Sequence, residues 1–171
     1  MAKWSYIHRS SSDLQAASET VLYEFRMVEY IANAKPPNVD WQANVRLESF
    51  LIHTRNLFHF LYGAGAARRG DIVAEDFTGN KRLKRTVPTD VSAELDRISK
   101  HLAHVTHARQ TKQSWDLRVY SQQIERGLDE FVALAAPGSL HNDWVGVPSP
   151  AGVLVQGLTV QTLGVTNSIG F

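Results

Sequence analysis

The chain has 171 residues, of which 43% are hydrophobic and 20% charged, proportions of a folded globular protein rather than a disordered or fibrous one. It contains no cysteine, which excludes disulfides, thiolate metal sites and cysteine nucleophiles. A formal net charge of +1 gives no overall attraction to nucleic acid or membrane, so any such binding must come from local patches.

The first residues, Met1 to Asp13, lack the apolar core of a signal peptide. No run of about 18 apolar residues follows anywhere in the chain. We therefore expect a cytoplasmic protein with no membrane partner.

The first helix is expected to begin at Ser12, whose hydroxyl would cap the first turn while Gln15 returns the bond as a capping box. Pro36 and Pro37 lie just beyond its end. Apolar residues recur at steps of three and four, which predicts one core-facing stripe: Leu14, Ala17, Val21, Phe25, Val28 and Ala32.

Three further helices are predicted from the same periodicity. One follows Asp40 as its N-cap and ends at Gly63, with the core stripe Leu47, Leu51, Thr54, Phe58 and Leu61. Another runs from about Val91 to Arg109, and a fourth from about Asp116 to Ala135. Together they predict an all-α fold, an antiparallel four-helix bundle that forms one domain over residues 1–136.

The connection between the second and third predicted helices has about 25 residues, far more than bundles usually need. Residues 71–77 are expected to form a short helical turn within it. Its second half is basic, and we predict that four of its side chains bind nucleic acid: Lys81, Arg82, Lys84 and Arg85.

Residues 137–171 form a tail that is rich in Gly, Val and Thr and carries no charge after Asp143. Such a composition favours extended or irregular structure over a bundle helix. Two interpretations remain: a strip that covers the bundle or a neighbouring subunit, and a frayed terminus.

The second predicted helix also carries a polar seam, which we define as Glu48, Arg55 and His59. These residues fall in a narrow sector beside the apolar stripe. An Arg and a His four residues apart can contact one phosphate together. The alternative is a partly exposed ion-pair seam between helices.

The segment Arg55-Asn56-Leu57-Phe58-His59 resembles the Arg-Asn…His signature of the HEPN superfamily, although it has three residues between Arg and His where the family has four to six. Many members are ribonucleases or toxins of defence systems. The resemblance implies that Arg55 binds the scissile phosphate, that Asn56 assists, and that His59 moves a proton in metal-independent cleavage. It also implies a homodimer in which two such sites meet.

The third predicted helix carries His101, His104 and His107 at steps of three, with Arg97 and Lys100 on the same side. This face is interpreted as a solvated surface, as an RNA groove to which Arg97, Lys100 and His101 contribute, or as a metal site. His104 or His101 is also a candidate for a second proton-transfer group. No Glu-x-x-His element occurs in these helices, so metal is the weakest interpretation and no cofactor is predicted.

Tyr23, Met27 and Tyr30 give the first helix a second apolar face opposite its core stripe. We expect the tail, another protein or a second subunit to cover it, and we favour a homodimer.

The sequence suggests three candidate functions. The leading one is binding of RNA or a nucleotide, with metal-independent RNA cleavage of a defence or toxin-antitoxin type by Arg55, His59, Asn56, Glu48 and His104. The alternatives are a noncatalytic interaction module, such as an antitoxin-like or accessory subunit, and a histidine-based metal-binding bundle.

Overall fold

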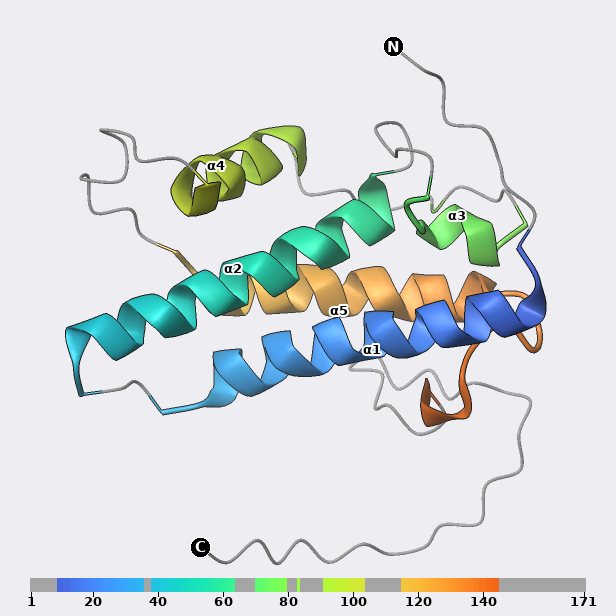
Figure 1. Cartoon of the computed structure of the whole chain (residues 1–171), viewed down its shortest axis with the longest axis horizontal. Helices are drawn as coiled ribbons and strands as arrows, with labels where there is room; N and C mark the ends of the chain where they lie inside the picture. The colour runs from blue at the N-terminus through green and yellow to red at the C-terminus, as the bar shows by residue number, and fades with distance from the viewer. Residues whose placement is uncertain are drawn as a thin grey trace, which may run out of the picture.

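The computed structural model describes residues 9–35, 38–63, 70–79, 83, 91–103 and 115–144. All regular elements in these ranges are helices, which confirms the predicted all-α bundle (Figure 1). They are α1 (Ser11–Asn33), α2 (Asp40–Tyr62), α3 (Ala74–Phe77), α4 (Val91–Ala103), α5 (Leu117–Leu134) and the short 3-10 helix η2 (Asn142–Trp144). None of the described helices is long and apolar enough to cross a membrane.

Helix α2 lies at the centre of the arrangement and packs against α1, α4 and α5. The long helices alternate in direction along the chain, so α1 is antiparallel to α2, while α2 and α5 run the same way (Figure 1). Helix α4 packs mainly on α2 rather than between α1 and α5. The bundle therefore has a compact three-helix body, with α4 attached along one side of α2.

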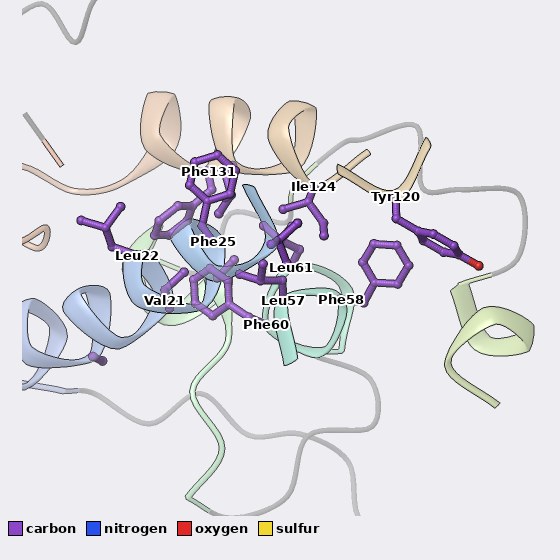
Figure 2. Close-up of a cluster of buried hydrophobic side chains, with 14 of the residues drawn as sticks. Val21, Leu22, Phe25, Leu57, Phe58, Phe60, Leu61, Tyr120, Ile124 and Phe131 are labelled. Carbon is purple, nitrogen blue, oxygen red and sulfur yellow. The ribbon is translucent and has the colours of Figure 1, made fainter. Parts of the chain in front are cut away.

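The core follows the predicted apolar stripes. Most of the predicted α1 stripe is buried, and Ala32 packs at its edge. From α2 and α5, side chains converge on the same centre (Figure 2). The fully buried members from these two helices are Phe50, Leu51, Leu57, Phe58, Leu61, Ile124 and Phe131.

The start of α1 differs from the prediction. Ser10, not Ser12, caps the helix: its Oγ accepts a hydrogen bond from the backbone N of Asp13 at 3.1 Å, and the Asp13 carboxylate accepts one from the Ser10 N at 3.3 Å. Gln15 was expected to close the capping box, but its amide donates to the carbonyl of Gly138 at 2.9 Å instead. Gln15 thus bonds a residue 123 positions away in the chain instead of the backbone of its own helix.

The other helix boundaries largely follow the sequence. Helix α5 begins close to the predicted start, and Asp116 caps it by accepting from the backbone N atoms of Arg118 and Val119. Helix α3 is the short turn expected within residues 71–77. Helix α2 begins one residue early, because Val39 and not Asp40 holds its N-cap position. The predicted end of the third helix, Arg109, lies outside the described residues.

Aromatic rings close the end of the bundle where α3 and η2 meet the long helices. Phe131 of α5 contacts the rings of Phe60, Phe77 and Trp144 at centroid distances of 5.0, 5.2 and 5.8 Å. The Trp144 indole donates to the backbone carbonyl of Ser18 in α1 at 2.9 Å. The first part of the predicted tail thus packs on α1, whereas residues 145–171 lie outside the described part of the chain.

Candidate functional site

The side of α2 that faces solvent consists of a central line of exposed residues and a polar flank on either side of this line. At about 100° per residue, Trp41, Val45, Ile52 and His59 lie within about 20° of one line along the helix. Arg55 and Glu48 fall on the flank toward α4, where Arg55 contacts that helix. Asn56 falls on the opposite flank, toward α1. Helix α2 therefore presents one exposed strip with different polar groups along its two edges.

Arg55 is held by α4. Its Nε donates to Ser99 Oγ at 3.1 Å, and the side chain is half-buried between the two helices. In the described part of the chain, the two terminal Nη groups of Arg55 form no hydrogen bond. A guanidinium fixed through Nε with its Nη groups unpaired is oriented to bind an anion. Glu48, also half-buried, lies on the same flank two turns earlier.

His59 lies one turn beyond Arg55, on the exposed strip. Although much of its side chain is accessible to solvent, the surrounding protein partly desolvates the imidazole and lowers its pKa below the ordinary 6.5. The nearby positive charge of Arg55 lowers the pKa further, and Asp71 opposes this shift. The His59 imidazole is therefore neutral at pH 7 and able to accept a proton.

An NMR pH titration is expected to give His59 a pKa below 6.5, and Arg55→Gln is expected to raise it by removing the repulsion between two positive charges. The His59 imidazole of the unfolded chain binds a proton more readily than that of the folded chain. The contribution of His59 to stability therefore falls as the pH drops from 6.5 toward the lower pKa that His59 has in the folded protein. Arg118→Gln, on the exposed surface of α5, is the matched control. An unchanged His59 pKa in Arg55→Gln would contradict the proximity of the two charges.

Asn56 points away from Arg55 and toward α1. Its Nδ2 donates to Glu24 Oε2 at 3.2 Å, and the same oxygen accepts from His53 Nδ1 at 2.6 Å. The ring of Tyr23 packs edge-on against His53 at 5.8 Å. Sequence reasoning did not find this Glu24–His53 pair, because no local pattern shows which residue of α1 meets which residue of α2. The structure thus brings Arg55 and His59 together and joins Asn56 to a different cluster.

The predicted nucleic-acid-binding residues of α4 are engaged in contacts within the chain. Arg97 stacks on Trp115 with its guanidinium carbon 3.9 Å from the ring centroid, and it pairs with Glu94 at 3.5 Å. Lys100 pairs with Asp96 of the preceding turn at 2.9 Å. His101 packs edge-on against the same Trp115 at 5.4 Å, and its buried Nδ1 has no hydrogen-bond partner among the described residues. Of the remaining predicted site residues, His104, Lys81, Arg82, Lys84 and Arg85 lie outside the described residues.

The junction of α4 and α5 holds a second titratable group that the sequence did not single out. The Tyr120 hydroxyl donates to the Glu94 carboxylate. Burial, together with this carboxylate, raises the pKa of Tyr120 well above its ordinary value. Tyr120 therefore stays protonated at physiological pH and serves as a hydrogen-bond donor that ties α5 to α4.

The histidine-based metal site gains no support from the described residues. Nowhere among them do three or more His, Asp or Glu side chains gather closely enough to hold a metal ion. His104 and His107 lie outside the described ranges.

An open depression at the end of α1 is lined by Arg26, Glu29, Tyr30, Asn33 and Ala34. Burial and the nearby Glu125 raise the pKa of Glu29 there.

The exposure of the second α1 face is uneven. Tyr23 and Tyr30 are 55% and 73% exposed, as expected for a surface that something else could cover. Met27 instead packs against the edge of the hydrophobic core.

No protein-family model, curated protein or solved structure matches the chain.

Proposed function

We propose that the protein binds RNA in the cytoplasm through Arg55 and His59 on α2. One observation carries this proposal: the Arg55 guanidinium is anchored to Ser99 by its Nε, while its Nη groups form no hydrogen bond to any described residue and a histidine lies one turn away. A phosphate can accept two parallel hydrogen bonds from such a guanidinium. The neutral imidazole adds a polar group beside the phosphate without adding repulsion to Arg55.

The same pair supports metal-independent cleavage, as the resemblance to HEPN ribonucleases implies. In this reaction His59 takes the proton of a ribose 2′-hydroxyl, whose oxygen attacks the phosphorus. The bond from phosphorus to the 5′-oxygen breaks, and that oxygen receives a proton from His59 in its protonated form. The products are a 2′,3′-cyclic phosphate and a 5′-hydroxyl. Arg55 stabilises the additional negative charge on the phosphate oxygens.

Asn56 has no part in this mechanism, because its amide is bonded to Glu24 on the α1 side. Glu48 lies on the Arg55 flank two turns away, at a distance of about 10 Å along the helix axis. The proposed chemistry is therefore carried by Arg55 and His59, with Ser99 of α4 as the residue that orients Arg55.

Binding is tested by fluorescence anisotropy with a labelled single-stranded RNA in buffer that contains EDTA. Arg55→Ala is expected to weaken binding about tenfold, as for the loss of one charged phosphate contact of about 1 to 3 kcal/mol. Arg118→Ala removes an exposed charge of the same sign from α5 and serves as the matched control. Equal affinities of Arg55→Ala and Arg118→Ala would overturn the proposed site.

Cleavage is tested on the same RNA by gel analysis of the products. We expect activity that survives EDTA, is abolished in His59→Ala and leaves cyclic phosphate ends. Activity that persists in His59→Ala would exclude this mechanism, and RNA binding without any cleavage would leave the protein as a binding module.

The second candidate is a noncatalytic docking module that uses the α1 surface. The exposure of Tyr23 and Tyr30, two turns apart on the same side of α1, favours it. Its predicted third residue, Met27, contributes less, because it packs on the core. A Tyr23→Ser/Tyr30→Ser double variant that retains every cellular partner of the wild-type chain in a pull-down would exclude this surface.

A further inference from the structure

The C-terminal part of the described chain follows one side of α1. The Gln15 amide donates to the Gly138 carbonyl at 2.9 Å, and the backbone N of His141 donates to Ser18 Oγ at 2.7 Å. The indole of Trp144, which is buried, donates to the Ser18 carbonyl at 2.9 Å. The chain therefore runs from Gln15 to Ser18, toward the C-terminal end of α1, and Trp144 anchors it there.

The open depression at the end of α1 lies farther along the same side of this helix. Its volume is about 430 Å³, within the range of ligand-binding sites. Its lining residue Asn33 comes about five full turns after Gln15, and Glu29 lies within about 20° of the line that passes through Ser18. The depression therefore continues the surface on which the C-terminal part of the chain is bound.

The sequence after Trp144 is long enough to reach the depression. Measured along the helix axis from Ser18, the first lining residue, Arg26, lies at about 12 Å and the last, Ala34, at about 24 Å. An extended chain advances about 3.3 Å per residue, so about four to seven residues after Trp144 cover this distance. Residues 145–151, which lie outside the described part of the chain, are therefore the ones that can occupy the depression.

The charge of the depression favours an uncharged occupant. Glu29 is half-buried, and burial together with the nearby charge of Glu125 raises the pKa of its carboxyl group. Another negative charge would be repelled by both carboxylates. Residues 145–151 carry no charged side chain, so they can cover Glu29 without such repulsion. The guanidinium of Arg26 supplies N–H donors for their backbone carbonyls.

The two prolines of this segment fit the aromatic ring of the depression. Pro148 and Pro150 lack N–H donors and favour the extended polyproline II conformation. Segments of this kind bind to exposed aromatic side chains. Tyr30 lines the depression and is 73% exposed, so its ring offers such a surface.

We propose that residues 145–151 bind in the depression at the end of α1 and pack on Tyr30. The chain's own segment fits better than a separate partner, because Trp144 holds it beside the depression at a high effective concentration. The bound segment covers Tyr30 and leaves Tyr23 exposed, so a partner that docks on both rings has to displace it. This consequence rests on the second candidate function, whereas the placement of the segment does not.

Disulfide trapping in the full chain tests the placement, because the protein has no cysteine of its own. The double variant Asn33→Cys/Ser149→Cys is expected to form an intrachain disulfide under mild oxidation, detected by mass spectrometry of its peptides. Adding Tyr30→Ser is expected to slow this reaction about tenfold, since it removes the ring on which the segment packs. Tyr23→Ser removes an exposed ring outside the depression and is the matched control. Equal rates with Tyr30→Ser and Tyr23→Ser, or no disulfide at all, would overturn the proposal.

A charge placed in the segment gives a second readout. Ser149→Lys is expected to lower the pKa of Glu29, measured by NMR titration, through attraction between opposite charges. Ser168→Lys adds the same charge near the end of the chain and is expected to leave this pKa unchanged. An unchanged Glu29 pKa in Ser149→Lys would contradict a segment held beside Glu29. Disulfide formation as expected, in a protein whose Tyr23→Ser/Tyr30→Ser variant keeps every partner, would support the placement and exclude the docking function.

Discussion

Phe131→Ala is expected to lower the free energy of unfolding by about 3 to 5 kcal/mol, the largest effect of any single substitution considered for this protein. The Phe131 ring is fully buried, and it contacts rings from α2, α3 and η2. Its removal leaves a cavity between four elements that cannot all move inward together, so both transfer free energy and packing are lost.

Urea denaturation followed by far-UV circular dichroism measures this effect. Val119→Ala, on the exposed surface of α5, is the control, with an expected change within about 0.5 kcal/mol. Phe131→Leu keeps more of the volume and should fall between the two. A loss below about 1 kcal/mol in Phe131→Ala would mean that the bundle end can collapse around the cavity, contrary to the tight aromatic packing.

Arg46→Ala is expected to cost about 2 to 3 kcal/mol, because Arg46 supplies the missing cap for the end of α1. Its guanidinium donates to the carbonyls of Ile31, Ala34 and Lys35, at 3.0 Å for Nε to Ile31 and 2.6 Å for each of the other two. The last turn of α1 has no basic residue of its own. The Arg46 charge also lies at the negative end of the α1 dipole.

The same denaturation measurement applies to Arg46, with Arg126→Ala on the exposed face of α5 as the control for loss of charge. Arg46→Lys should retain the interaction with the helix dipole and lose most of the hydrogen bonding, since an ammonium cannot reproduce the guanidinium fork. Equal stabilities of Arg46→Lys and wild type would show that charge alone, not the set of carbonyl bonds, stabilises this helix end.

Only part of the candidate site could be predicted from the sequence. The spacing of Arg55 and His59 places them on one side of α2 whatever the tertiary packing. Burial is the main cause of the lowered pKa of His59, and the charge of Arg55 lowers this pKa further. Asn56 belongs to the same pentapeptide but joins Glu24, because a step of one residue turns the side chain by about 100°. Arg97 was a candidate for RNA binding by its charge, and in the structure its guanidinium stacks on Trp115, a residue 18 positions away.

The sequence by itself determined that the chain forms amphipathic helices, where most of them begin and end, and which stripe of each is buried. These properties arise from interactions within a few residues, namely helical periodicity, capping and the burial of apolar side chains. Only the tertiary structure decided that Arg46 caps α1, that Ser99 orients Arg55, and that Gln15 bonds Gly138 rather than its own helix. Those pairings join residues 12 to 123 positions apart, and they depend on how the helices pack, which no local pattern specifies.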